Sequence, residues 1–216
     1  MGFLISFEQR PVKAKGLNQS ALPNEEKIQE YLFPDEYLNL SLLKNIYRME
    51  YPENPILFYP GCGADILMPL KYVEILFPRL RNITFIFNDA DNNLGLIKTI
   101  LDDVGISFKQ KKKNFLQFYW KGILVDLKFI QGNAFEMVAG ISAFDIYFER
   151  AFRIMKDDHD DYEEKVFQKL KPNGILISDS GYQQLPLEKI EVSQELSSYR
   201  EMIIGIKKEI MYSNKK

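Results

Sequence analysis

Short apolar runs alternate along this chain with segments whose apolar residues recur at helical spacing. The apolar runs lie at residues 56–59, 83–87, 124–131, 144–148 and 174–178. Helical patterns cover residues 36–50, 66–77, 94–104 and 159–170. Strands that alternate with helices in this way predict a mainly parallel sheet covered on both faces. We therefore expect an α/β fold of the doubly wound type.

Two further patterns add antiparallel strands to this sheet. Residues 115–120 and 123–130 are apolar runs on either side of Lys121-Gly122, which predicts a hairpin that turns there. Residues 188–196 and 199–209 are extended runs that predict an antiparallel pair at the end of the chain.

The first part of the chain has a different character. Residues 11–34 are polar and interrupted by prolines, which predicts an irregular arm with one short helix. Asp35 stands where it could cap the helix that follows. We expect an N-terminal arm over residues 1–34 and a single α/β domain over residues 35–216.

Composition narrows the class of protein. The chain has 216 residues, of which 46% are hydrophobic, and its 28 basic and 30 acidic residues leave a net charge of −2. That balance gives no general electrostatic reason to expect nucleic acid as a partner. The only cysteine, Cys62, excludes an intrachain disulfide and suits a reducing compartment. No apolar run approaches the roughly 20 residues that span a bilayer, so we expect a soluble, cytoplasmic protein.

The turn after the first apolar run carries the strongest chemical signal. Its sequence is Tyr59-Pro60-Gly61-Cys62-Gly63-Ala64-Asp65. The two glycines lack Cβ atoms, so the backbone could turn sharply and approach a ligand closely. Ligands of open α/β sheets bind beyond the carboxyl ends of the strands, which is where this turn lies. A tight connection that binds nothing is the alternative.

Asp65 bears on the kind of ligand. Its carboxylate could accept hydrogen bonds from the first N–H groups of the next helix, which would otherwise hold a phosphate. A fixed negative charge there disfavours the pyrophosphate of a dinucleotide and suits a cationic ligand.

Five motifs in order then resemble the class I S-adenosylmethionine-dependent methyltransferases. They are the glycine turn, the acidic pair Asp89 and Asp91, the stretch from Phe129 to Phe135, the strand Phe144 to Phe148, and Leu170-Lys171-Pro172-Asn173-Gly174. The resemblance covers roughly residues 35–210. It implies a Rossmann-like, doubly wound, mainly parallel sheet with an antiparallel C-terminal strand pair. It also implies S-adenosylmethionine as the cofactor.

The resemblance assigns roles to individual residues. Cofactor-binding residues would be Tyr59, Gly61, Cys62, Gly63, Asp65, Asp89, Asp91, Asn133, Ala134 and Phe135. Asp89 would accept hydrogen bonds from the ribose hydroxyls, and Asn133 would offer its amide to the adenine, with Ala134 and Phe135 beside the base. A turn that caps the next helix is the alternative for the two aspartates, and core packing is the alternative for Phe135.

Some positions depart from the family pattern. Tyr59 stands where the family often has an acid, and Pro60 directly precedes the first glycine. After the fourth parallel strand the chain has Glu149-Arg150, which are the candidate catalytic residues, in place of Asn-Pro-Pro-Tyr. A surface salt bridge is the alternative for this pair. Methyl transfer needs mainly positioning, and it needs a base only when the acceptor is protonated.

Three other features are given no functional role. Residues 109–113 contain four lysines and are expected to form a solvated loop before the hairpin. The acids around His159 are expected to begin a helix, and no metal is expected there. Cys62 has no histidine near it in sequence, so it is not expected to act as a nucleophile, although a helix dipole would lower its pKa.

We therefore expect a methyltransferase that uses S-adenosylmethionine and acts on a small-molecule acceptor. Small molecules are favoured as acceptors because the chain shows no added domain for binding nucleic acid or peptides. The alternative is a non-catalytic, methyltransferase-like module that binds a nucleoside or a protein partner. An oxidoreductase that uses NAD is a third, weaker reading.

Overall fold

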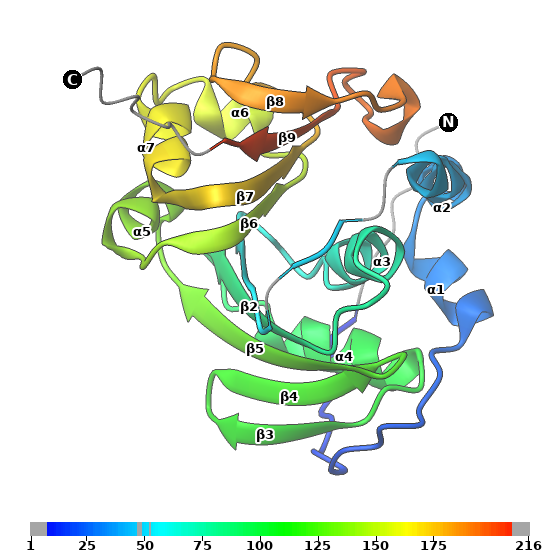
Figure 1. The fold of residues 1–216 in the computed structure, drawn as a ribbon. Coiled ribbons are helices and arrows are strands. Elements are labelled where there is room, and N and C mark those ends of the chain that lie inside the picture. The colour runs from blue at the N-terminus through cyan, green and yellow to red at the C-terminus, as the bar shows by residue number, and fades with distance from the viewer. Residues whose placement is uncertain (1–7, 47–48, 52, 209–216) are drawn as a thin grey trace.

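A single twisted sheet forms the centre of the molecule (Figure 1). The computed structural model describes residues 8–46, 49–51 and 53–208. Within this described part the strands are β1 (Ile56–Pro60), β2 (Asn82–Asp89), β3 (Phe108–Lys112), β4 (Phe115–Trp120), β5 (Ile123–Gln131), β6 (Phe144–Glu149), β7 (Leu170–Ser178), β8 (Leu187–Ile190) and β9 (Ile203–Lys207). Their order across the sheet is β3-β4-β5-β2-β1-β6-β7-β9-β8.

The middle of this sheet is parallel and its two ends are antiparallel. Strands β5, β2, β1, β6 and β7 pair in parallel. Strand β9 runs antiparallel to both β7 and β8, and β4 runs antiparallel to both β3 and β5. This confirms the Rossmann-like, doubly wound sheet with its antiparallel C-terminal pair. Strand order reverses between β1 and β6, so the carboxyl end of β1 lies where such folds bind ligands.

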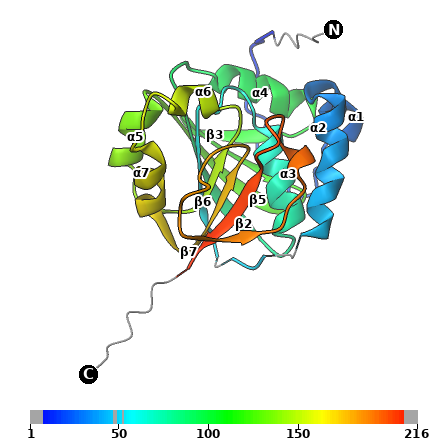
Figure 2. The same ribbon diagram turned by 90° about the horizontal axis from the view of Figure 1, so that it is seen from above.

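Helices cover the sheet from two sides (Figure 2). On one side lie α1 (Glu25–Tyr31), α2 (Pro34–Asn39), the 3-10 helix η1 (Leu40–Asn45), α3 (Leu67–Leu76) and α4 (Leu94–Asp103). On the other side lie α5 (Ala134–Gly140) and α7 (Tyr162–Lys169). The short helix α6 (Arg153–Lys156) follows β6 at the carboxyl edge of the sheet, and the 3-10 turn η2 (Gln194–Leu196) precedes β9.

Burial along the strands matches these layers. Every residue of β6 is buried, as are the last four residues of β1, because helices lie on both sides of the central strands. In β4 buried residues alternate with partly exposed ones, so only one of its faces is covered. The larger core lies on the side of α3 and α4, and a smaller core around Phe58, Phe144 and Tyr162 lies on the side of α5 and α7.

The first predicted helix is shorter than its pattern suggested. Helix α2 begins at Pro34, and Phe33 occupies the N-cap position, so the prediction that Asp35 caps this helix is wrong. Proline suits the first helical turn because it has no N–H group to leave unpaired. The helical run continues only as η1 to Asn45, and Tyr47, part of the predicted pattern, lies outside the described residues.

Both predicted antiparallel pairs form. Strands β4 and β5 pair as expected, and the turn at Lys121-Gly122 has positive φ angles of 46° and 84°. At the chain end, strands β8 and β9 are shorter than the predicted runs, and η2 occupies part of the first run.

The predicted solvated loop over residues 109–113 is wrong. Residues up to Lys112 belong to β3, an edge strand that pairs with β4. Phe108 is buried opposite Phe118 and anchors the strand, while the lysines after it remain exposed. A strand with one exposed edge and one exposed face shows little apolar pattern, so the lysines concealed it.

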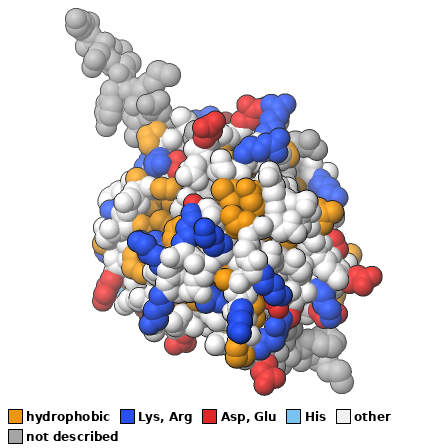
Figure 3. Space-filling model, turned by 90° about the horizontal axis from the view of Figure 1, so that it is seen from below, with side chains coloured by type: hydrophobic (Ala, Val, Ile, Leu, Met, Phe, Trp, Pro, Cys, Tyr) orange, Lys and Arg blue, Asp and Glu red, His pale blue; other side chains and the backbone are white. Residues whose placement is uncertain are grey.

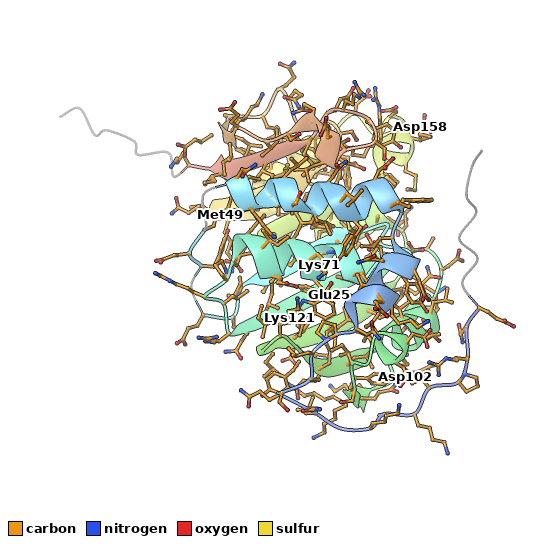
Figure 4. The ribbon with its side chains drawn as sticks, turned by 90° about the vertical axis from the view of Figure 1, so that its right-hand side faces the viewer. Glu25, Met49, Lys71, Asp102, Lys121 and Asp158 are labelled. Carbon is orange, nitrogen blue, oxygen red and sulfur yellow. The ribbon has the colours of Figure 1, made fainter. Side chains whose placement is uncertain are left out.

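A charged cluster joins α1 to the rest of the molecule (Figure 4). The ammonium groups of Lys71 and Lys121 each lie 2.8 Å from a carboxylate oxygen of Glu25 in α1. Both lysines also pair with Glu74 of α3, and Lys71 lies over the ring of Trp120. These contacts join the predicted arm to α3 and to the β4–β5 turn. The division into an arm over residues 1–34 and a domain over residues 35–216 stays a prediction.

Candidate functional site

The glycine turn after β1 is fixed by the end of β2. Gly61 and Gly63 have φ angles of 57° and 53°, the left-handed region that favours glycine. The N–H of Cys62 donates to the carbonyl of Asn88 at 3.2 Å, and the N–H of Gly63 donates to Oδ2 of Asp89 at 2.7 Å. The turn is therefore held in one conformation by two hydrogen bonds to the neighbouring strand.

The two glycines differ in what lies beside them. A Cβ atom on Gly61 would lie 2.4 Å from the ring of Phe152, whereas a Cβ atom on Gly63 would meet nothing within 4 Å. Gly61 thus allows the close packing of Phe152 against the turn. Gly63 faces open space, as expected for a backbone that a ligand approaches closely.

A cavity of about 610 Å³ opens at this turn. That size lies within the range of about 300–1,000 Å³ that is typical of small-molecule sites. Its walls come from the turn, from the segment that joins α1 to α2, from α4 and from the end of β6. The predicted site residues in its wall are Tyr59, Gly61, Cys62, Gly63, Asp65 and Arg150.

Three charged side chains meet in the wall of this cavity. The guanidinium group of Arg150 pairs with the carboxylate of Glu36 and lies 3.3 Å from Oδ2 of Asp65. Burial alone would lower the pKa of Arg150, but Asp65 and Glu36 raise it above its usual value. Arg150 therefore stays charged, and the three groups together carry one net negative charge.

Asp65 is further held by its neighbours. Its Oδ1 accepts from the N–H of Met68 at 3.1 Å, so it satisfies an N–H of the first turn of α3 as predicted. Its Oδ2 accepts from the hydroxyl of Tyr59 at 3.0 Å. Burial raises the pKa of Tyr59 well above its usual value, and Asp65 adds to this, so the hydroxyl stays protonated and donates.

The acidic pair after β2 lies beside the turn. Besides the bond from Gly63, Asp89 accepts at Oδ1 from the N–H of Asp91 at 3.0 Å. This is the turn-forming contact that was the alternative to ribose binding. An ionised carboxylate has about four acceptor positions, so Asp89 retains about two for a ligand. Neither aspartate is part of the cavity wall, and the ribose role of Asp89 stays a prediction.

The residues assigned to the adenine lie away from the cavity. Asn133 caps α5 by accepting from the N–H of Phe135 at 2.9 Å, and Ala134 is buried in the smaller core. The ring of Phe135 stacks on His159 and also contacts Phe152 and Tyr162. The structure thus shows the packing alternative for Phe135, and its place beside a base stays a prediction.

Two expectations about single residues are corrected. Burial raises the pKa of the Cys62 thiol well above its usual value, and Asp89 and Asp65 add to the effect. A lowered pKa from the helix dipole is therefore wrong. The proposed surface salt bridge between Glu149 and Arg150 is also wrong, because both side chains are buried or largely buried and each has other partners.

Glu149 belongs to a buried polar cluster on the side of α7. Its Oε1 pairs with Nζ of Lys156 and accepts from Oγ of Ser178 at 2.7 Å. Its Oε2 accepts from the hydroxyls of Tyr147 at 2.5 Å and Tyr182 at 2.8 Å. Burial raises the pKa of both tyrosines well above the usual value, so they remain donors. Glu149 is fully buried and faces away from the cavity, so it is not placed to act on a ligand there.

Several wall residues were not predicted. Glu36 comes from α2, Tyr31 to Phe33 come from the α1–α2 segment, and Leu96 and Ile100 come from α4. Glu36 lies 114 positions before Arg150, and the sequence carries no signal that pairs them. The apolar spacing of α4 could have indicated Leu96 and Ile100 only as core residues.

The described residues contain neither a cluster of metal ligands nor a helix that could cross a membrane. No group of three or more His, Cys, Asp or Glu side chains there could hold a metal ion. In the same residues, no helix has the length and apolar character needed to cross a bilayer.

Comparison with known proteins gives structural likenesses only. No protein-family model matches the sequence, and no curated protein does. Among solved structures, a methyltransferase from Geobacter sulfurreducens is 14% identical, with a TM-score of 0.47 over 81% of this chain and 78% of that one. Precorrin-6y C5,15-methyltransferase from Geobacter metallireducens is 15% identical, with a TM-score of 0.38 over 66% of this chain.

A third likeness is to a SAM-dependent methyltransferase from Thiobacillus denitrificans in complex with S-adenosyl-L-homocysteine. It is 15% identical, with a TM-score of 0.40 over 68% of this chain and 48% of that one. The chain spans 59% of the precorrin enzyme, so it corresponds to only part of that protein. The strand order and pairing described above, rather than these likenesses, define the fold of this chain.

Proposed function

We propose that this chain is a methyltransferase that uses S-adenosylmethionine and acts on a small-molecule acceptor. The observation that carries the proposal is the position of Arg150 between Glu36 and Asp65, in the wall of a cavity beside Gly63. S-adenosylmethionine ends in an ammonium group and a carboxylate. A guanidinium flanked by two carboxylates offers a partner for each of these groups.

The remaining groups fit the rest of the donor. Gly63 leaves open space in front of the turn, and Asp89 keeps acceptor capacity for ribose hydroxyls. The net negative charge of Glu36, Asp65 and Arg150 opposes the pyrophosphate of NAD and suits the positive sulfonium of the donor. The bound donor would supply an electrophilic methyl group, and this chain's residues would position it.

Arg150 is not a base, and Glu149 is enclosed by its own partners. Glu36 and Asp65 are the carboxylates in the cavity wall, and both are paired with Arg150. Positioning is therefore the main contribution we assign to these residues, which suits an acceptor that is already deprotonated.

Calorimetry tests the cofactor. We expect S-adenosylmethionine and S-adenosyl-L-homocysteine to bind, and NAD to bind far more weakly. Asp89→Ala should weaken donor binding about ten- to a hundredfold if its carboxylate holds the ribose through charge-assisted bonds. Glu191→Ala removes an exposed carboxylate outside the cavity wall, so it is the control and should leave the affinity nearly unchanged. If neither donor nor product gives heat at millimolar concentration, the cofactor assignment is wrong.

Asp65→Asn tests the discrimination against NAD. The amide keeps an acceptor for the N–H of Met68 but removes the negative charge beside Arg150. We expect weaker donor binding and a smaller preference over NAD. An unchanged preference would show that the charge of Asp65 does not select the ligand.

A non-catalytic binding module remains the second candidate. The observation in its favour is that the carboxylates of Glu36, Asp65 and Asp89 all have partners within the chain. Incubation with methyl-labelled donor and a panel of small amines, thiols, phenols and carboxylic acids separates the two candidates. Donor binding without transfer to any of these acceptors would favour the binding module.

A further inference from the structure

One face of the β3–β4–β5 sheet is not covered by any described helix. Figure 1 shows α4 behind these strands and no helix in front of them. The partly or fully exposed residues on this uncovered side include Lys109, Lys111, Lys112, Phe115, Gln117, Tyr119, Leu124, Asp126 and Lys128. Strand pairing places them together, because Lys109 lies opposite Gln117 and Phe115 lies opposite Lys128. We call this surface the open face.

The open face carries most of the positive charge of its region. Residues 108–131 contain six lysines and one aspartate, although the whole chain has a net charge of −2. Lys121 is turned to the other side, where it pairs with Glu25 and Glu74. A bulge between Gln110 and Lys112 brings Lys111 over the ring of Phe115 at 5.1 Å and to 3.2 Å from Oδ1 of Asp126.

The other lysines of this surface are not neutralised. Among the residues that the structure describes, Lys109, Lys112 and Lys128 form no ion pair, and all three are exposed. Figure 3 views the molecule from below, toward the β3 edge of the sheet next to this surface, and shows several Lys and Arg side chains there, with acidic side chains mostly toward the rim. The balanced total charge therefore conceals a local excess of positive charge.

Aromatic rings lie among these lysines. Phe115 and Tyr119 are partly exposed on the same face of β4. They are four residues apart, which is about 13 Å along a strand. Flat rings between ammonium groups can stack with bases while the ammonium groups bind phosphates, and this combination binds single strands.

Protection of the sheet edge does not account for this surface. Lysines on an edge strand such as β3 oppose pairing with other chains. Lys128, however, is in β5, which has β4 on one side and β2 on the other. Partly exposed rings would also weaken such protection rather than add to it.

We propose that the open face binds single-stranded nucleic acid. Lys109, Lys112 and Lys128 contact phosphates, and Tyr119 stacks with a base. A second copy of the chain is a poor occupant, because two such faces would bring like charges together. Duplexes are disfavoured because their bases are already stacked on one another. The proposal rests on charge and exposed rings, so it holds with or without the methyl donor.

Fluorescence anisotropy with labelled 15-nucleotide oligo-U and oligo-dT tests the proposal. We expect both to bind the full chain in 50 mM salt and a hairpin duplex to bind at least tenfold more weakly. Each phosphate contact to a single strand contributes about −0.7 to the slope of log affinity against log salt. The triple variant Lys109→Gln/Lys112→Gln/Lys128→Gln should therefore make the slope less negative by about 2. Its affinity should fall at least tenfold.

The matched control removes the same charge elsewhere. Lys44→Gln/Lys189→Gln/Lys208→Gln changes three exposed lysines that lie outside the open face. This control should leave the affinity within about twofold. Tyr119→Thr keeps a residue that favours strands and should weaken binding severalfold with little change in the salt slope. Circular dichroism and thermal melting of each variant verify that it is folded.

Several results would overturn the proposal. These are no binding of either oligonucleotide at 50 mM salt, equal binding of duplex and single strand, or equal loss in the two triple variants. Light scattering tests whether a second copy of the chain occupies the open face instead. A dimer that dissociates in Tyr119→Thr, together with no oligonucleotide binding, would assign the open face to a second copy. Preference for oligo-U over oligo-dT would identify RNA as the ligand, and the reverse would identify DNA.

Discussion

Gly61 and Gly63 have nearly the same backbone conformation but opposite surroundings. The space beside Gly61 is filled by the ring of Phe152, and the space beside Gly63 is open. The first glycine therefore serves packing within the chain, while the second leaves room for a ligand. Asp89 connects them to β2 through the N–H of Gly63. The turn is therefore rigid, and it leaves open space at one position, Gly63.

Alanine substitutions separate these two roles. Gly61→Ala places a side chain in a left-handed conformation and against Phe152, so we expect a loss of unfolding free energy of about 2–5 kcal/mol. Gly63→Ala carries only the conformational cost, about 1–2 kcal/mol, but its methyl group enters the open space. Urea denaturation measures the loss of unfolding free energy in each variant. Calorimetry with the donor measures whether the methyl group at position 63 weakens binding. Equal losses of stability in the two variants would contradict the packing role of Gly61.

Asp179, the residue after β7, provides a pH-dependent test. Its Oδ2 accepts from the N–H of Ala151 at 2.7 Å, and its Oδ1 is buried without a partner among the described residues. Burial raises the pKa of this carboxyl above its usual value of 3.8. The protonated carboxyl contributes its full stabilisation at pH values below its pKa in the unfolded chain. This contribution is lost as pH rises through the higher pKa that the carboxyl has in the folded protein. The ionised form therefore destabilises the protein at neutral pH.

We expect Asp179→Asn to be more stable than wild type at pH 7, because the amide keeps an acceptor for Ala151 without the buried charge. The advantage should shrink as pH falls toward 4. Urea denaturation at several pH values measures it. A difference that does not vary with pH would show that the charge of Asp179 is not the cause.

At the scale of elements, the buried pair Glu149–Lys156 joins β6 to α6. Lys156 also donates to the carbonyl of Ser180 at 2.8 Å, so one ammonium group connects α6 to the end of β6 and to the segment that follows β7. This arrangement holds the segment from Arg150 to Phe152 against the glycine turn. The position of Arg150 in the cavity thus depends on contacts made on the other side of the sheet.

Lys156→Met should lower the unfolding free energy by about 3–5 kcal/mol, because it leaves the charge of Glu149 buried without its partner. The double variant Glu149→Gln/Lys156→Met removes both charges and should recover most of this loss. Chemical denaturation of wild type, the two single variants and the double variant gives the coupling between the two residues. A double variant as unstable as Lys156→Met would mean that lost packing, not charge, is the cause.

Helix α1 offers a second test at this scale, since it is attached through Glu25. Glu25→Gln removes the charge that Lys71 and Lys121 share, so amide exchange should become faster in α1 around the buried residue Ile28. Glu26→Gln is the matched control, because Glu26 is exposed in the same helical turn. Hydrogen exchange read by mass spectrometry compares the two. If amide exchange in α1 became equally fast in both variants, the cause would be the loss of a negative charge at the start of the helix, and not the loss of the ion pairs with Lys71 and Lys121.

The central strands and both antiparallel pairs could be predicted from the sequence, but the edge strand β3 could not. Strands β1 and β6 are covered on both faces, which leaves continuous apolar runs that are easily recognised. Strand β3 is covered on one face only, and its lysines were taken for a loop. The glycine turn was recognised from local sequence. The meeting of Glu36, Asp65 and Arg150 was not, because it depends on how distant segments pack.

At the scale of the whole molecule, the sheet separates two surfaces. The cavity lies on the side of α1, α3 and α4, at the carboxyl end of β1. The open face lies on the other side of β3, β4 and β5. Ligands could therefore occupy the two surfaces at once, and substitutions on the open face should not change donor binding.

Thermal unfolding tests the cavity on the intact molecule. A ligand that binds only the folded state at about 100 times its Kd adds about 2.7 kcal/mol to the unfolding free energy. For a domain of this size that corresponds to a rise in Tm of about 5–11 °C. We expect S-adenosyl-L-homocysteine to give such a shift and NAD at the same concentration to give little.

The lysine triple variant of the open face should show the same shift as wild type, because its lysines lie outside the cavity wall. A shift that is lost in this variant would place the two ligands on one connected surface.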